Sequence, residues 1–139
     1  MFKIKVLKRE DVENVLNVED VIKAVEEAYS YKARKEAEVF PMIFHEFEPG
    51  VADMDIKAGY LKGANIYGFK QVSLFSENTK KGLPALNGSM MIFEGDTGRP
   101  LGLLDASFIT SIRTGAAGTI GIKHLARKDS KNLVIVGSG

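Results

Sequence analysis

The feature that most constrains the fold is a run of five strand-like segments in the middle of the chain. They are separated by clusters of Gly, Pro, Asp and Asn, which are typical of tight turns. The turns at 48–50 and 94–98 are short enough to join neighbouring strands as antiparallel hairpins. The segments are residues 39–47, 52–60, 66–75, 85–93 and 100–106. This pattern predicts an antiparallel sheet.

The sequence predicts one further strand and two helices before these segments. Residues 2–7 alternate apolar and charged side chains and predict a first strand, and residues 9–16 predict a short helix. Asn17 is a favourable N-cap, with Asp20 in the first turn, and apolar residues then recur at helical spacing to about residue 36. An amphipathic helix followed by a run of strands predicts an α+β fold, in which helices pack on one face of the sheet.

The C-terminal part has a different composition. Residues 110–127 are small and apolar and include three glycines, each of which weakens an isolated helix by about 1 kcal/mol. We therefore expect a helix that is held by tertiary contacts and packs closely against another backbone. A polar stretch, 126–131, then leads into an apolar strand predicted over 132–136. That strand must either pair with another copy of the chain or pack on its own domain.

Gly137, Ser138 and Gly139 directly follow this predicted strand. A Gly-x-Gly after an apolar strand is how a dinucleotide-binding turn begins, because the first glycine makes the tight turn and the second lets the backbone approach a pyrophosphate. The sequence therefore predicts a domain boundary, with residues 1–128 forming one domain and residues 129–139 beginning another.

Composition excludes several classes of function. Nineteen basic and eighteen acidic residues leave a net charge of +1, so the sequence predicts neither a nucleic-acid partner nor a membrane partner. The absence of cysteine excludes disulfides and thiolate chemistry, and two distant histidines predict no metal site. The N-terminus lacks the apolar core of a signal peptide, and we expect a cytoplasmic protein.

Two basic residues stand in unusual places. Lys70 interrupts an apolar strand, so it either meets an anion in the interior or lies on the solvent face. Arg113 lies early in the small-residue helix, where the helix dipole disfavours a cation. It therefore needs a carboxylate or phosphate partner, either in a ligand or in a structural salt bridge.

A polar row lies along one predicted strand. Asp53, Asp55 and Lys57 alternate and so share a face, which is either the wall of a polar site or the solvated side of the sheet. His45 lies between aromatic residues, which is more typical of a hydrogen-bonded core histidine than of a catalyst.

Seven short motifs, in this order, resemble the ornithine cyclodeaminase/mu-crystallin family, which includes NAD-dependent alanine dehydrogenases. The motifs are residues 68–70, 78–84, 97–101, 104–106, 110–117, 125–127 and 134–139. The resemblance covers essentially the whole chain but only the first part of a family member. It implies a substrate-binding and dimerisation domain that ends at the first strand of a truncated Rossmann domain.

The resemblance also implies roles for individual residues. Lys70 is expected to bind the substrate carboxylate and to assist proton transfer at the amino-bearing carbon. Arg113 is expected to clamp that carboxylate near the nicotinamide, with Thr114 beside it on the cofactor side. Asp55 is expected to line the substrate pocket. The family often carries an arginine after a proline where this chain has Met42, and His45 and Lys57 are expected to compensate. Gly137, Ser138 and Gly139 are expected to contact NAD.

The implied activity is NAD-dependent conversion of an L-amino acid through an imine. Two outcomes remain open, namely cyclisation of L-ornithine to L-proline with loss of ammonia, and oxidative deamination of a small amino acid such as alanine. The family resemblance also implies a homodimer formed through the antiparallel sheet. We expect the isolated 139-residue chain to be inactive. The alternative is a truncated, non-catalytic dimeric relative that binds a small ligand or a partner.

Overall fold

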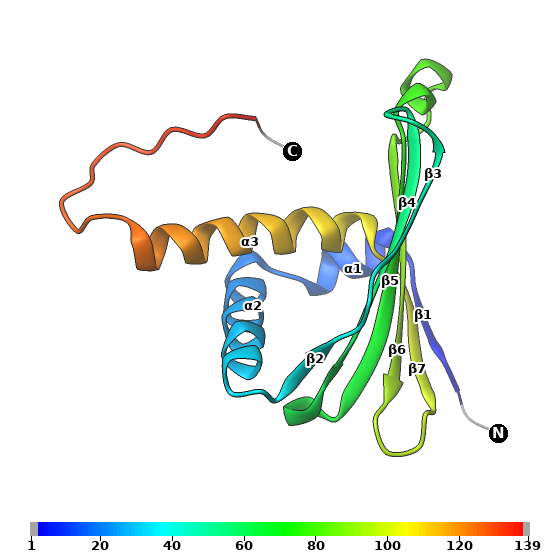
Figure 1. Cartoon of the computed structure of the whole chain (residues 1–139), viewed down its shortest axis with the longest axis horizontal. Helices are drawn as coiled ribbons and strands as arrows, with labels where there is room; N and C mark the ends of the chain where they lie inside the picture. Colours follow the sequence, from blue (N-terminus) through cyan, green and yellow to red (C-terminus); the bar gives the residue numbers. More distant parts are fainter. Residues whose placement is uncertain (1–2, 138–139) are drawn as a thin grey trace.

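The computed structural model describes residues 3–137 and contains one sheet with helices on one side of it (Figure 1). The strands in the described range are β1 (Lys5–Leu7), β2 (Ala37–Val39), β3 (Ile43–Glu48), β4 (Ala52–Leu61), β5 (Ile66–Phe75), β6 (Leu86–Glu94) and β7 (Pro100–Asp105). The α-helices are α1 (Arg9–Val15), α2 (Val18–Ala33) and α3 (Ser107–Leu125). Two 3₁₀ turns, η1 (Lys62–Ala64) and η2 (Ser76–Lys81), follow β4 and β5. The predicted α+β class is confirmed.

The sheet is antiparallel from β4 to β7, as the hairpin turns predict. Its order is β1-β7-β6-β5-β4-β2, and β3 also pairs with β4. The first strand adds a feature that the sequence did not indicate, because β1 pairs with β7 in parallel. The longest ladder joins β4 to β5, with Ala52 opposite Phe75 and Leu61 opposite Ile66.

One predicted strand is two strands in the structure. The segment 39–47 is interrupted between β2 and β3, which pair with different halves of β4. Pro41 lies in the interruption, and a proline cannot donate a backbone hydrogen bond to a sheet ladder. The break therefore follows from a residue that a continuous strand does not tolerate.

The helices form a layer on one side of the sheet. At the start of α2 the side chain of Asn17 accepts a hydrogen bond from the Asp20 N–H at 2.9 Å, so the predicted N-cap is confirmed. Helix α3 runs away from the sheet and packs on α1 and α2 (Figure 1). The buried apolar residues of this layer are Val12, Val21, Ala116 and Ile120.

Close backbone packing at the α3 glycines was expected, and the described residues do not show it. A Cβ built on Gly115, Gly118 or Gly121 meets no atom within 4 Å. Ala116 and Ile120, only 3% and 7% exposed, make the buried contacts of the helix instead. Ala116 and Ile120 thus lie on one buried stripe of α3, while its glycines face open space.

The strand predicted over 132–136 is not formed. Residues 131–137 are assigned to no helix or strand, and Val134 and Val136 are 83% and 97% exposed. An apolar strand needs a partner edge for its backbone groups, and no strand of the described residues pairs with this segment. Separately, no helix within residues 3–137 is long and apolar enough to cross a bilayer.

Candidate functional site

The N-terminus of α3 is fastened to strand β6, and this fixes the direction in which α3 leaves the sheet. The Ala106 N–H donates to the Gly88 carbonyl at 2.9 Å, and the Gly88 N–H donates to the Ser107 hydroxyl at 3.1 Å. Asp105 caps the same turn by accepting from the Ser107 N–H at 3.0 Å. Ala106 is completely buried. The first turns of α3 are thus held against the middle of the sheet.

Lys70 reaches from β5 to this helix. Its ammonium group donates to Thr110 Oγ1 at 2.9 Å, and the Thr110 hydroxyl in turn donates to the Ala106 carbonyl at 2.7 Å. Because the hydroxyl hydrogen is already used, the oxygen of Thr110 is the acceptor for Lys70. Lys70 therefore faces the helical side of the sheet, where it is half-buried rather than solvated.

The surroundings of Lys70 favour its neutral form. Burial lowers the pKa of Lys70 first, and the charges of Arg113 and Lys57 lower it further, while Asp55 acts in the opposite direction. A lysine whose pKa is lowered exchanges protons more readily near neutral pH than an exposed lysine does. The geometry and the charge together make Lys70 the candidate acid–base group.

The polar row on β4 lies on the same face as Lys70. The register places Lys57 directly opposite Lys70, and since alternate residues share a face, Asp53 and Asp55 lie on that side as well. Lys57 Nζ binds Asp55 Oδ2 at 2.6 Å. The other carboxylate oxygen, Asp55 Oδ1, is buried and has no hydrogen-bond donor in the described part of the chain.

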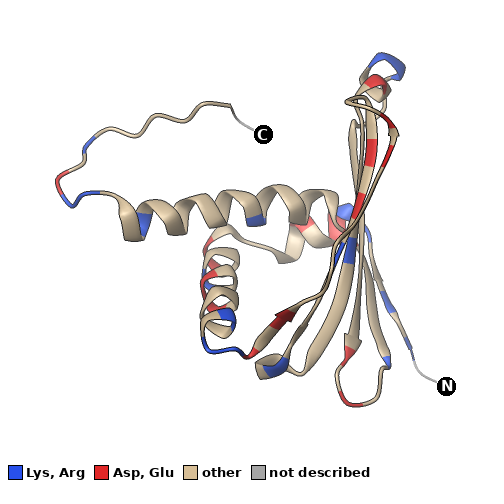
Figure 2. Ribbon diagram, viewed as in Figure 1, with Lys and Arg blue, Asp and Glu red and all other residues tan. Residues whose placement is uncertain are grey.

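Helix α3 supplies a third cation. It carries Arg113 and Lys123 and no acidic residue (Figure 2). Arg113 is exposed and close enough to Lys70 to act on its pKa, and it makes no ion pair with any residue of the described range 3–137. Thr114, the next residue, donates its hydroxyl to the Thr110 carbonyl at 2.7 Å. Residues 3–137 therefore do not supply the carboxylate or phosphate partner that the sequence predicts for Arg113.

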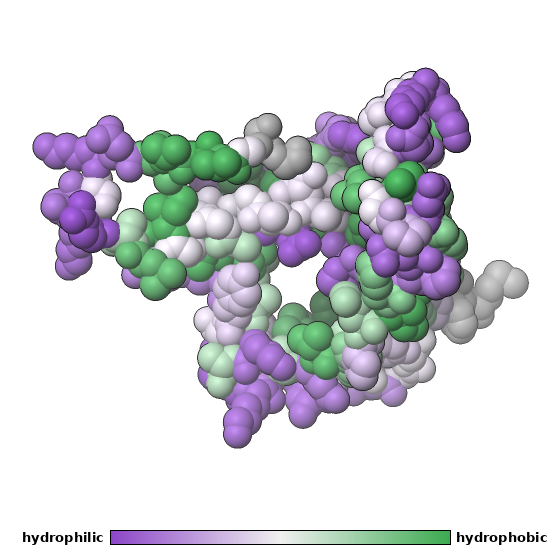
Figure 3. Space-filling model, turned by 45° about the horizontal axis from the view of Figure 1, so that its top comes forward, coloured by the Kyte–Doolittle hydropathy of each residue, from purple (hydrophilic) through white to green (hydrophobic). Residues whose placement is uncertain are grey.

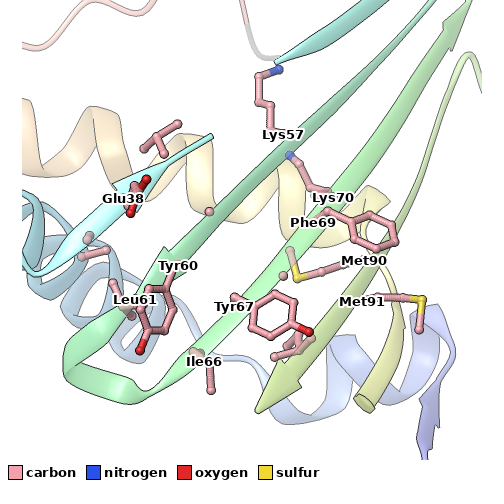
Figure 4. A pocket seen from close by; sticks show the side chains of 16 residues that line it. Glu38, Lys57, Tyr60, Leu61, Ile66, Tyr67, Phe69, Lys70, Met90 and Met91 are labelled. Atoms are coloured by element: carbon pink, nitrogen blue, oxygen red, sulfur yellow. The ribbon is translucent and has the colours of Figure 1, made fainter. Parts of the chain in front are cut away.

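We call Lys57, Lys70, Arg113 and Asp55 the charged cluster. A cavity of about 380 Å³ lies beside Lys57 and Lys70, between helix α2 and the strands β2, β4, β5 and β6. The space-filling view shows the molecule hollowed between the helices and the sheet (Figure 3). Lys57 and Lys70 lie at one end of the cavity, away from Tyr60, Leu61 and Ile66 (Figure 4). The lining is otherwise mainly apolar, with Ala28, Val39, Met90 and Ile92 contributing.

Several predicted site residues are not brought to this cluster. His45 packs against Phe47, whose ring in turn contacts Phe75. Phe75 is five residues from Lys70 on β5, so His45 lies on the opposite face of the sheet. Gly137 is exposed with a φ of +85°, and Ser138 and Gly139 lie outside the described residues.

The sequence did not single out Thr110 as the anchor of Lys70. The two residues are 40 positions apart, and a threonine in a small-residue helix carries no pattern that indicates a half-buried acceptor. No cluster of three or more His, Cys, Asp or Glu side chains suited to a metal ion occurs within residues 3–137.

Comparison with known proteins places this chain in a family. The chain matches the ornithine cyclodeaminase/mu-crystallin family over residues 3–139, and it belongs to that family. An alanine dehydrogenase of Archaeoglobus fulgidus is 38% identical over 134 residues, which is 96% of this chain and 40% of the relative.

Solved structures show the same fold. The Δ¹-pyrroline-2-carboxylate reductase of Thermococcus litoralis, solved with NADH and L-proline, superposes with a TM-score of 0.86 at 38% identity, covering 92% of this chain and 40% of that one. An archaeal alanine dehydrogenase dimer with bound NAD superposes with a TM-score of 0.86 at 37% identity, covering 91% and 38%. The chain thus spans about two fifths of the length of these relatives.

Proposed function

We propose that this chain is the substrate-binding and dimerisation part of an NAD-dependent enzyme that interconverts a small L-amino acid and its imine. The observation that carries the proposal is Lys70 on β5, which is half-buried beside the first turn of α3, with its pKa lowered and its ammonium group hydrogen-bonded to Thr110. The relatives named alanine dehydrogenase and pyrroline-2-carboxylate reductase support a small neutral amino acid or cyclic imino acid in preference to ornithine.

Lys70 and Arg113 together suit a carboxylate. Arg113 presents a planar fork of donors that matches the two oxygens of a carboxylate, and it has no internal ion pair in the described range. Lys70 contributes a second positive charge and a proton that its surroundings make easier to release. In this proposal Arg113 binds and orients the carboxylate, while Lys70 accepts and returns the proton of the substrate nitrogen.

We assign one side of an NAD site to Arg113, Thr114 and Gly137. Arg113 and Thr114 lie on the exposed surface of α3, and Gly137 has the positive φ that a tight glycine turn requires. When bound, the nicotinamide exchanges a hydride with the substrate carbon. A pyrophosphate also needs the N-terminus of a following helix, which residues 3–137 do not supply. The isolated chain is therefore proposed to bind substrate weakly and to lack turnover.

The side of the sheet that faces away from the helices suits a second copy of the chain. Exposed large apolar side chains gather there, and a patch of this kind on a soluble domain marks an interaction surface. They include Val6, Ile43, Phe47, Phe69 and Leu103. We include a homodimer through this face in the proposal; the archaeal alanine dehydrogenase dimer supports an assembly of two copies, and the exposed apolar side chains support this face.

Ligand titration of the chain tests the proposed site. We expect L-alanine and L-proline to perturb the side-chain NMR signals of Lys70 and Arg113 at millimolar concentration, because two convergent cations bind a carboxylate weakly in water. Lys70→Met and Arg113→Met each should reduce affinity about tenfold, the effect of removing one charged hydrogen bond.

The matched control is Lys62→Met, which removes a positive charge at the far end of the β4–β5 hairpin and should bind like the parent chain. Equal binding by all three variants would remove Lys70 and Arg113 from the site. Calorimetry with NAD⁺ and NADH runs alongside, and micromolar binding by this chain would show that the cofactor site needs no further residues.

A further inference from the structure

Two lysines face each other directly across the central strand pair, which is an arrangement that sheets usually avoid. The register sets Lys57 opposite Lys70, and Cβ atoms of directly opposed residues lie about 4.5–5.5 Å apart. Like charges in this position destabilise a sheet. Stability alone therefore does not account for the pair.

The two ammonium groups bind different partners. Lys57 Nζ binds Asp55 Oδ2 at 2.6 Å, whereas Lys70 Nζ binds Thr110 Oγ1 at 2.9 Å. Both lysines lie at the same end of the cavity (Figure 4). Asp55 thus holds Lys57 along its own strand and leaves Thr110 to Lys70.

The position of Asp55 leaves one of its carboxylate oxygens without a hydrogen bond in the described part of the chain. Its side chain is only 23% exposed, and its Oδ1 atom is buried without a hydrogen-bond donor in the described part of the chain. An unsatisfied buried acceptor destabilises a fold. The carboxylate is therefore placed where its charge acts on the two lysines rather than where it would be best hydrogen-bonded.

We propose that the Asp55–Lys57 ion pair is a positioning element for Lys70, which keeps a second positive charge beside Lys70 while preventing Lys57 from competing for Thr110 or for the substrate carboxylate. This inference rests on the proposed role of Lys70. Asp55 and Lys57 need not touch the reacting atoms, because they act through the proton affinity and the orientation of Lys70.

The charges that face Lys70 come from two neighbouring elements. Strand β4 contributes Lys57, which lowers the pKa of Lys70, and Asp55, which raises it, while α3 contributes Arg113, which lowers it. The partner of Lys70 on strand β6 is the uncharged Met90. Removing Lys57 should therefore make Lys70 more basic, and removing the charge of Asp55 should make it less basic.

The experiment measures Lys70 itself, without ligand. The chain is treated with trinitrobenzenesulfonate near pH 8.5, and modification of Lys70 is followed by peptide mass spectrometry. We expect Lys57→Met to react about threefold more slowly and Asp55→Asn about threefold faster, because the first change raises the pKa of Lys70 and the second lowers it, which changes its unprotonated fraction. The double variant should react close to the parent rate, because the two effects oppose each other.

Two variants serve as controls. Lys57→Arg keeps the charge and the ion pair, and Lys62→Met removes a distant charge, so both should match the parent rate. Changes of the same sign in the two single variants, or no change in folded protein, would overturn the proposal. If Asp55→Asn does not fold, the comparison of Lys57→Met with Lys57→Arg decides. Since no substrate is present, this outcome is independent of whether the chain binds amino acids.

Discussion

The two faces of the sheet are built from the same strands and have opposite characters. The helical face is the side on which the helices lie, and the bare face is the side that points away from them (Figure 1). On the helical face, Lys57 and Lys70 meet the hydroxyl and charged groups of α3 and β4. On the bare face, aromatic rings lie against one another, with Tyr67 and Phe93 stacked at 5.0 Å between ring centroids. Alternation along β5 is the cause, because Tyr67 and Lys70 are three residues apart and so point to opposite sides.

This difference shows how one sheet can serve two functions. The helical face has a cavity and a cationic cluster, both suited to a small anionic ligand. The bare face has no covering helix in the described range, and Phe47 and Phe69 remain 57% and 37% exposed there. A second copy of the chain would shield these side chains without obstructing the ligand side.

A negative charge introduced on the bare face should have the largest effect of these substitutions, because it should dissociate the proposed dimer. Phe69→Glu places a carboxylate in the centre of the proposed dimer interface, where an unpaired buried charge costs several kcal/mol. We expect the parent chain to be a dimer and this variant to be a monomer by multi-angle light scattering at tens of micromolar.

The matched control lies on the opposite face. Phe44 is 54% exposed, and its pairing with Asp55 sets it on the helical side. Phe44→Glu should therefore leave the oligomeric state unchanged. A monomeric parent chain, or a dimer that survives Phe69→Glu, would contradict the assignment of the bare face as the interface.

A methyl group at Gly68 should have an intermediate effect, on the fold instead of the assembly. A Cβ at this position would overlap the backbone carbonyl of Met91 on strand β6, so the central strands must separate locally. We expect Gly68→Ala to lower the free energy of unfolding by about 2–4 kcal/mol in urea titrations followed by circular dichroism.

Gly118→Ala is the opposite case for the same substitution. A Cβ there meets nothing within 4 Å, and alanine favours a helix interior over glycine by about 1 kcal/mol. This variant should be as stable as the parent chain or more stable. Destabilisation of both variants to the same extent would show that the space around α3 differs from that described.

Much of the sheet could be predicted from the sequence, because alternation and turn residues are local. The shared face of Asp53, Asp55 and Lys57 follows from spacing alone, and the register confirms it. The face of His45 was not predictable, since it depends on how β3 pairs with β4 around a bulge between Glu46 and Glu48.

Long-range contacts account for the remaining gaps. The bond from Lys70 to Thr110 joins residues that are 40 positions apart, and no local pattern specifies it. The apolar run 132–136 has the composition of a strand, but a strand also needs a neighbour, and the described chain provides none. The apolar composition of this segment favours a strand, but a strand forms only where its backbone pairs with a neighbouring one.

The smallest effect should come from the exposed ion pairs between α2 and α3, which we call the α2–α3 joint. Glu26 accepts from Lys123 Nζ at 2.9 Å and contacts His124 Nε2 at 2.7 Å. Lys123 and then His124 lower the pKa of Glu26 below its ordinary value of 4.5. A lowered carboxyl pKa contributes stability that is present above 4.5 and is lost as the pH falls through the lowered value. The joint should therefore matter at pH 7 and not in acid.

Glu26→Gln tests this with thermal melts at several pH values. We expect a slightly lower Tm than the parent at pH 7 and a difference that disappears as the pH falls through the lowered pKa of Glu26, because both proteins are then neutral at this position. Glu38→Gln is the control, since Glu38 makes no ion pair within residues 3–137. A Tm difference for Glu26→Gln that persists unchanged into acid would mean that the side chain stabilises the joint through its shape and not its charge.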